Sequence, residues 1–372
     1  MTRHSKTNVL VVFGGASSEH EVSLMSAESV IKFIDHEQYH VVAAGITKDG
    51  RMELHGDLEE MNSRDWNGFN QAVFSHDENQ SPLFFSPGTG SVYQLQGKRV
   101  VPLEVDVVFP ILHGPFGEDG RFQGLLEMCG IPYVGAGVLA SAAAMDKGIT
   151  KRLLQQAGIP QTEYREYRIF PGETEIDSVF RTIDRDMAYP LFIKPANLGS
   201  SLGISRVERK EQLMEAVRLA TEYDTKILAE KAVDAREIEC AVLGSRQPAA
   251  SIPGEVLPSK TFYDYEDKYL SGASRTQVPA RLTDQQVQSV QKMAVQVYRL
   301  LECQGMARVD FFLDNNSGAL LVNEINTLPG FTAISLYPKM WEASGVSYAE
   351  LIHRLIQDAM EKGTALGTQR FR

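Results

Sequence analysis

A lysine followed at once by a glycine- and serine-rich run is the first feature of this sequence that suits chemistry. In KPANLGSSLG, Lys194 closes a short apolar stretch and two glycines and two serines follow. Bare N–H groups and serine hydroxyls in such a run can cradle anionic oxygens, while a lysine supplies a point charge. A β-hairpin turn with a solvated lysine is the alternative. These ten residues alone favour the hairpin, because the G-x-x-x-x-G-K-[ST] order of a phosphate loop is absent.

A second polar group lies on a predicted hairpin, ARVDFFLD-NNSG-ALLVNEIN. Alternation places Arg308 and Asp310 on one face, and Glu324 and Asn326 on one face of the partner strand. A turn centred near Asn316 puts Glu324 opposite Arg308 and diagonal to Asp310. Two carboxylates and an amide oxygen suit Mg²⁺, which prefers oxygen ligands and substrate phosphates. A solvated face with an Arg–Glu pair is the commoner arrangement, but the Pro-Gly turn that follows favours a ligand site.

Two polar residues follow predicted strands nearer the N-terminus. His113 opens HGPFGEDG after an apolar run, at the strand end where open α/β sheets bind ligands. Glu19 follows FGGAS at a helix start, where the helix dipole alone favours an acidic residue. His113 is a candidate for substrate contact or a structural residue, and Glu19 a candidate ammonium ligand or a dipole partner. The residues leave both pairs of alternatives open.

Composition excludes several classes of partner. The 372 residues are enough for two or three domains, and the net charge of −11 argues against nucleic acid or an anionic membrane as the main partner. Small anions such as nucleotides need only local cations. The three cysteines form no C-x-x-C motif, which is typical of a reduced cytosol. The N-terminus has no signal-peptide pattern and no membrane span follows, so the expected location is the cytoplasm.

Apolar patterning predicts the elements that position these side chains. Three continuous apolar runs predict buried parallel strands, with a helix between the first two runs. The runs are NVLVVFGG, HVVAAGIT and VDVVFPILHG. Residues 50–100 are uninformative. YVGAGVLASAAAMDKGITKRLLQQAG gives small residues and then a strong helix ending at Gly158, and the first boundary lies in this helix. Short elements to about residue 235 form a small α+β part. The remainder is a second α+β body with helices at 283–302 and 347–362.

Seven motifs, in order along nearly the whole chain, resemble those of the D-alanine:D-alanine ligase family, within the ATP-grasp superfamily. They are GGASSEHEVSL, HGPFGEDGRFQG, MDKGITKRLL, KPANLGSSLGIS, FYDYEDKY, ARVDFFL and NEINTLPGFT. The resemblance leaves roughly 50–100 and the tail past 363 uncovered. It departs from the family at Leu198 and Leu202, where a polar residue and a valine are more usual; we expect these to tune loop closure.

The resemblance implies a three-domain ATP-grasp architecture of α/β and α+β class. Residues 1–146 would form an N-terminal parallel-sheet domain that binds substrate, 147–235 the central ATP-grasp domain, and 236–372 the C-terminal domain with the metal site. ATP would lie between the last two. The expected partners are D-alanine and ATP, with two Mg²⁺ (or Mn²⁺) ions and a homodimer.

The resemblance also implies roles for single residues. ATP would be bound by Lys147 and Lys194 at its phosphates, by Ser200 and Ser201 in the covering loop, by Glu230 and Lys231 at adenine and by Glu237 at ribose. Metal ions would be held by Asp310, Glu324 and Asn326. Substrate would be bound by His113, Lys268, Gly330 and Ser335, and Arg308 would stabilise developing charge. Glu19 would bind the first ammonium group and join Ser200 and Tyr269 in a hydrogen-bonded link.

The chemistry implied is ATP-dependent ligation of two D-alanines through an acyl phosphate, for peptidoglycan precursor synthesis. A D-alanine:D-lactate ligase or another ATP-grasp carboxylate–amine ligase is the alternative within the superfamily. A nucleotide-binding regulator without turnover is the alternative from another class. The Arg308, Asp310, Glu324 and Asn326 set argues against a regulator, because a binding module has no need of it.

Overall fold

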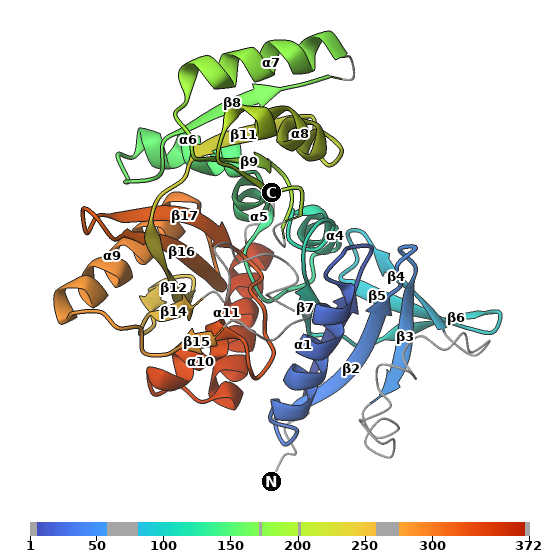
Figure 1. Cartoon of the computed structure of the whole chain (residues 1–372). Coiled ribbons are helices and arrows are strands. Elements are labelled where there is room, and N and C mark those ends of the chain that lie inside the picture. Colours follow the sequence, from blue (N-terminus) through green and yellow to red (C-terminus); the bar gives the residue numbers. More distant parts are fainter. Residues whose placement is uncertain (1–5, 58–80, 171–172, 200–201, 258–274, 369–372) are drawn as a thin grey trace.

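The computed structural model describes residues 6–57, 81–170, 173–199, 202–257 and 275–368 (Figure 1). Within these residues the chain forms three sheets, each covered by helices. No described helix is both long enough and apolar enough to cross a bilayer.

The first sheet has seven strands in the order β6-β5-β4-β3-β2-β1-β7. Their bounds are β1 (Thr7–Gly14), β2 (Tyr39–Ile46), β3 (Met52–Asp57), β4 (Ser81–Ser86), β5 (Ser91–Gln96), β6 (Arg99–Leu103) and β7 (Val107–Leu112). The predicted parallel strands are confirmed, since β1 pairs in parallel with both β2 and β7. The segment that patterning left uninformative adds β3 to β6, all antiparallel to their neighbours.

Alternate residues of β1 bury into different cores on the two faces of this sheet. Val11 packs in the core that includes α1 (His20–Phe33), and Val12 packs in the core that includes α4 (Arg121–Cys129). Both are fully buried. A strand covered on both faces reads as a continuous apolar run, which is why NVLVVF could be recognised from sequence.

The predicted helix that ends at Gly158 is confirmed as the second of two consecutive helices, because the chain breaks at Asp146. Helix α5 (Val138–Met145) ends there and α6 (Lys147–Gln156) begins. Asp146 takes an extended backbone and its side chain accepts a hydrogen bond from the Ile149 N–H at 2.9 Å. An N-cap of this kind starts a new helix within an otherwise helical pattern. The break places Lys147 at the first position of α6.

The second sheet, green to yellow in Figure 1, has the order β10-β9-β11-β8. Its elements are β8 (Tyr164–Arg168), α7 (Glu173–Asp186), β9 (Leu191–Pro195), β10 (Ser205–Val207), α8 (Lys210–Thr221) and β11 (Lys226–Lys231). The hairpin interpretation of KPANLGSSLG holds for its flanks, because β9 and β10 pair antiparallel on either side of the segment. This sheet has a core of its own, formed with α7 and α8.

The third sheet runs β15-β14-β12-β16-β17, with β13 paired to β12. Its strands are β12 (Ala235–Leu243), β13 (Ala249–Ala250), β14 (Gly254–Leu257), β15 (Arg275–Gln277), β16 (Met306–Asp314) and β17 (Leu320–Asn326). Its helices are α9 (Asp284–Leu300), α10 (Leu336–Ala343) and α11 (Tyr348–Thr368), of which α10 was not predicted. Val309 and Phe311 of β16 pack against α9, so the alternating residues Arg308 and Asp310 lie on the opposite face.

The β16–β17 register differs from the one predicted. Arg308 pairs with Asn326, and Asp310 pairs with Glu324, so Glu324 lies opposite Asp310 and not opposite Arg308. Next to the turn, Leu313 pairs with Leu320, which is already one residue off the predicted register. A bulge after Asp310 leaves Asn323 without a partner in the ladder and adds a second residue to the shift. The four side chains still share one face, as predicted.

The first and third parts of the chain share one hydrophobic core. Helix α11 (red in Figure 1) packs against α1 and β7, and the same cluster holds residues of β12 and α10. The rings of Phe109 and Phe331 meet edge to face with centroids 6.0 Å apart. Because Phe331 follows β17 closely, this packing brings the polar end of β17 up to the end of β7.

Candidate active site

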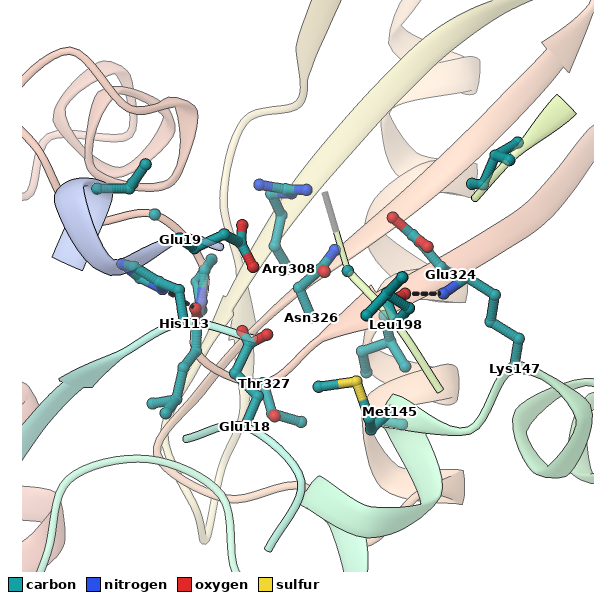
Figure 2. Close-up of a pocket in the computed structure, with 18 residues that line it drawn as sticks. Glu19, His113, Glu118, Met145, Lys147, Leu198, Arg308, Glu324, Asn326 and Thr327 are labelled. Carbon is teal, nitrogen blue, oxygen red and sulfur yellow. Dashed lines mark hydrogen bonds between the residues drawn. The ribbon is translucent and has the colours of Figure 1, made fainter. Parts of the chain in front are cut away.

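One pocket collects side chains from all three parts of the chain (Figure 2). The residues that were predicted from sequence and that line it are Glu19, His113, Lys147, Arg308, Glu324, Asn326 and Gly330. They come from the start of α1, the end of β7, the start of α6, the β16–β17 pair and the segment after β17. The segment after β9 contributes Leu198 and Gly199.

Arg308 is the central cation of the pocket. Its Nε and Nη2 donate to the two oxygens of Asp310 at 2.7 and 2.6 Å, and Nε lies 2.9 Å from Oε2 of Glu239. Asn326 Nδ2 donates to Asp310 at 3.0 Å. Burial opposes the charge of Arg308, but Asp310 and Glu239 outweigh it and raise the arginine pKa further. The guanidinium is therefore a fixed positive charge that faces the pocket.

His113 is buried and joins the first part of the chain to the segment after β17. Its Nδ1 lies 3.0 Å from the Leu328 carbonyl oxygen, which can only accept, so Nδ1 carries the proton. Its Nε2 lies 3.3 Å from the Ser26 hydroxyl, and Ser26 accepts from the Phe331 N–H at 3.4 Å. Burial lowers the pKa of His113, which keeps the imidazole neutral. His113 holds the 328–331 segment in place against α1.

The Glu19 carboxylate is buried between two glycines. A Cβ added to Gly114 would lie 2.9 Å from Glu19 Oε2, and one added to Gly199 would lie 3.1 Å from it. Gly114 also has φ +76°, a region that disfavours side chains. The backbone of two separate segments can therefore approach this carboxylate closely only because neither residue has a side chain.

Lys147 connects α6 to the glycine-serine segment. Its Nζ donates to the Leu198 carbonyl oxygen at 2.5 Å, drawn as a dashed line in Figure 2, and its N–H donates to the Ala196 oxygen at 3.1 Å. The ammonium group points into the pocket beside Glu324 (Figure 2). A lysine held in this way is well placed for anionic oxygens.

A buried ion cluster joins α6 to the second sheet. Lys194 Nζ lies 2.9 Å and Lys151 Nζ 3.4 Å from the carboxylate of Glu230, and all three side chains are almost fully enclosed. The Thr162 hydroxyl contacts both Lys151 and Glu230. Burial would raise the pKa of Glu230, but the two ammonium groups outweigh it and lower the pKa to about 2. Sequence reasoning found Lys194 and Glu230 but missed Lys151.

Glu118 is a pocket residue that sequence reasoning also missed. Its Oε2 accepts a hydrogen bond from the Gly114 N–H at 2.9 Å. Burial, and then the charge of Glu19, raise the pKa of Glu118 well above its usual range, which favours the protonated carboxyl. The signal was present in HGPFGEDG, but spacing could not tell Glu118 from Asp119. In the fold Asp119 turns away and pairs with Arg121 at 2.8 Å.

Some of the other predicted residues lie near the pocket, and others do not line it. Ser335 is beside Gly330, since a Cβ on Gly330 would lie 3.2 Å from the Ser335 hydroxyl. Lys231, which is exposed, ends β11, and Glu237 is on β12. Neither residue lines the pocket. The residues outside the described part of the chain are Ser200, Ser201, Lys268 and Tyr269.

The charges of the pocket suit a divalent cation that is bound together with phosphate. Two carboxylates, Glu19 and Glu324, and two cations, Lys147 and Arg308, line the pocket. The carboxylates of Asp310 and Glu239 bind Arg308 as well. Carboxylates therefore outnumber cations around the pocket. Across the described ranges, no three acidic, histidine or cysteine side chains form a ready-made metal cluster. Two carboxylates and one amide are nevertheless a donor set that Mg²⁺ accepts when phosphate oxygens complete its shell. Asp310, Glu324 and Asn326 fit that description.

Comparison with known families gives matches over both halves of the chain. Residues 8–136 match the model of the D-ala D-ala ligase N-terminus, and residues 153–357 match that of the C-terminus. A D-alanine--D-alanine ligase of Thermoanaerobacter sp. is 46% identical over 361 residues, which cover 96% of this chain and 97% of the relative. A Caldicellulosiruptor bescii protein of the same name is 45% identical over 96% of both chains.

Solved structures of the same kind superpose on nearly the whole chain. The D-alanine-D-alanine ligase of Coxiella burnetii has a TM-score of 0.82 at 34% identity and covers 98% of this chain and 97% of its own. A D-Ala:D-Ser ligase of Enterococcus faecalis has the same TM-score and identity, with 95% and 99% covered. Two proteins with different second substrates therefore match this fold equally well.

Proposed function

Because this chain belongs to the D-alanine--D-alanine ligase family, with its ATP-grasp architecture, we propose that the pocket at Glu19, Arg308 and Glu324 is where it joins two D-alanines. The protein is an ATP-dependent ligase that forms D-alanyl-D-alanine for peptidoglycan synthesis. The observation that carries the placement is the convergence of residues predicted from separate motifs on one pocket.

The first step activates a carboxylate, which is a poor acylating agent until it is phosphorylated. The γ-phosphoryl group of ATP passes to the carboxylate of the first D-alanine, giving an acyl phosphate and ADP. Lys147, which lines the pocket, and Lys194 of β9 supply positive charge for the phosphates. Asp310, Glu324 and Asn326 would hold two Mg²⁺ (or Mn²⁺) ions, which would supply positive charge for the transferred group when bound.

The second step forms the peptide bond. The amine of the second D-alanine attacks the acyl carbon, and inorganic phosphate leaves the tetrahedral intermediate. Negative charge develops on oxygen in both steps, and the fixed guanidinium of Arg308 faces the space where it would form. Glu239 and Asp310 hold that guanidinium from behind, so it costs no reorganisation during the reaction.

Substrate recognition follows from the side of the pocket near α1. Glu19 would receive the ammonium group of the first D-alanine, and His113, neutral and immobile, would shape the same end. Gly330 and Ser335 would meet the carboxylate of the second D-alanine, together with Lys268. Ser200, Ser201 and Tyr269 complete the proposed closure over the site. Glu230, Lys231 and Glu237 would contact the adenine and ribose of ATP.

The division into 1–146, 147–235 and 236–372 is part of the proposal. The separate core of the second sheet supports a central domain. The break at Asp146 supports its first boundary. A homodimer and a cytoplasmic location are likewise proposed.

The test is phosphate release from ATP with a panel of D- and L-amino acids and D-lactate, with products separated at pH 6 and pH 8. We expect release with D-alanine, and dipeptide as the dominant product at both pH values when D-lactate is equimolar. A dominant depsipeptide or D-Ala-D-Ser product would assign another second substrate. No release with any D-amino acid would contradict the proposed function.

Gly114→Ala is expected to impair binding of the first D-alanine. A methyl group at 2.9 Å from Glu19 Oε2 must displace that carboxylate, and a misplacement of about 1 Å commonly costs about 10²-fold in rate. The matched control is Gly130→Ala, where φ is +73° and no atom lies within 4 Å of the added Cβ. Both variants carry the same backbone strain, so the difference in kcat/KM for D-alanine isolates the contact with Glu19. Equal losses of kcat/KM in the two variants would contradict the assignment of Glu19 to substrate binding.

A further inference from the structure

Asp224, in the turn between α8 and β11, binds the start of the glycine-serine segment, KPANLGSSLG (residues 194–203). Asn197 donates to Asp224 Oδ2 twice, from its N–H at 2.9 Å and from Nδ2 at 2.8 Å. The other oxygen, Oδ1, accepts from the Lys226 N–H at 3.0 Å. One carboxylate thus joins the last residue before Leu198 to the first residue of β11.

The preceding residue of the same turn contacts the far end of the segment. Gly203 has φ +68°, and a Cβ added there would lie 2.7 Å from the Tyr223 ring and 2.8 Å from Pro195. The Tyr223 ring therefore lies directly on the Gly203 backbone. Two adjacent residues, Tyr223 and Asp224, hold the two ends of the segment, although neither lines the pocket.

A short chain of contacts leads from this turn to the pocket. The Ala196 N–H donates to the Lys226 oxygen at 2.9 Å, and the Lys147 N–H donates to the Ala196 oxygen at 3.1 Å. The buried Lys226 ammonium binds Asp146, the N-cap of α6, at 2.5 Å. Lys147 in turn contacts the Leu198 carbonyl oxygen. The position of Leu198 thus depends on Asp224 on one side and on Lys147 on the other.

We propose that Asp224, through Asn197, is a positioning residue that sets where Leu198 and Gly199 meet Lys147 and Glu19. The inference rests on the proposed function, because that function gives Lys147 to the ATP phosphates and Glu19 to the first D-alanine. Asp224 touches neither substrate. Its carboxylate fixes the backbone that closes one wall of the pocket.

Loss of this anchor has a specific chemical consequence. If Leu198 and Gly199 are no longer held in place, water can reach the acyl phosphate. The acyl phosphate is then hydrolysed to D-alanine and phosphate, and no dipeptide forms from it. ATP is consumed in both outcomes, so the ratio of phosphate released to dipeptide formed rises above the value of one that ligation requires. A purely structural role for Asp224 would lower the amount of active enzyme and leave this ratio unchanged.

The test compares Asp224→Ala with Asp106→Ala in the full-length chain. Asp106 is a matched control, because its Oδ2 accepts from Asn8 in the same way, from the N–H at 2.7 Å and from Nδ2 at 3.2 Å, at a site outside the pocket. We expect Asp224→Ala to lower kcat/KM for ATP by about tenfold, the size expected when hydrogen bonds to a charged acceptor are lost. Phosphate release should also uncouple from dipeptide formation. Asp106→Ala should keep the wild-type ratio.

Two further measurements keep the outcomes separate. Asn197→Ala combined with Asp224→Ala should do less harm than the sum of the single changes, because both remove the same contact. Asp224→Asn, which retains an acceptor oxygen, should recover part of the coupling. A wild-type phosphate-to-dipeptide ratio in folded Asp224→Ala, or additive effects with Asn197→Ala, would overturn the inference. Absence of dipeptide from the wild-type chain would overturn the proposed function instead.

Discussion

Glu324→Gln is expected to lower the rate of dipeptide formation by about 10²–10³-fold, the usual cost of removing one electrostatic group from a transition-state site. Glu324 lies opposite Asp310 on the β16–β17 pair and lines the pocket. Glutamine has the same shape but carries no charge, so a metal ion held there would lose one of two carboxylate ligands. The fold should be unaffected, because the replaced side chain faces the pocket.

The measurement is single-turnover dipeptide formation across a magnesium titration. Glu350→Gln is the control, since Glu350 forms an exposed pair with Arg354 on α11, 2.7 Å apart, and exposed pairs contribute little. Unchanged melting temperatures in both variants would show that the fold survives. Near wild-type turnover of Glu324→Gln at saturating magnesium would contradict the assignment of Glu324 as a metal ligand.

The second large effect is expected on stability. Glu230→Gln leaves Lys151 and Lys194 buried without their shared carboxylate, and breaking a buried ion cluster in this way costs about 3–5 kcal/mol of unfolding free energy. Urea denaturation measures it. Glu163→Gln, directly before the edge strand β8 of the same sheet, is the control, since its exposed pair with Arg165 should change stability by less than about 0.5 kcal/mol.

The pH dependence of this effect has a defined sign. Glu230 has a pKa of about 2 in the fold against a usual value of 4.5. A carboxyl group whose pKa is lowered by folding stabilises the protein above its unfolded pKa, and that contribution is lost as the pH falls through the folded value. The difference between wild type and Glu230→Gln should therefore be constant from pH 8 to about pH 5 and shrink below about pH 4.5. A difference that grows on acidification would contradict the charge assignment of the cluster.

Local sequence was enough to determine the parallel strands of the first sheet and the face that carries Arg308, Asp310, Glu324 and Asn326. Both depend on alternation and on continuous apolar runs, which are properties of neighbouring residues. The ordered motifs identified the family, and the comparisons confirm it. Glycine positions were informative as well, since Gly199 lies where a backbone must approach Glu19.

Tertiary structure alone decided the pairings. The sequence placed Glu324 opposite Arg308, but a one-residue offset at the turn and the bulge at Asn323 together move it opposite Asp310, because a ladder register depends on both strands at once. Lys151 reads as one more polar residue of an amphipathic helix until β9 and β11 bring Lys194 and Glu230 to it. Burial and charge partners come from contacts between distant segments, and these set the ionisation of Glu230, His113 and Glu118. Residue types were therefore readable in advance, whereas their electrostatic states required the assembled fold.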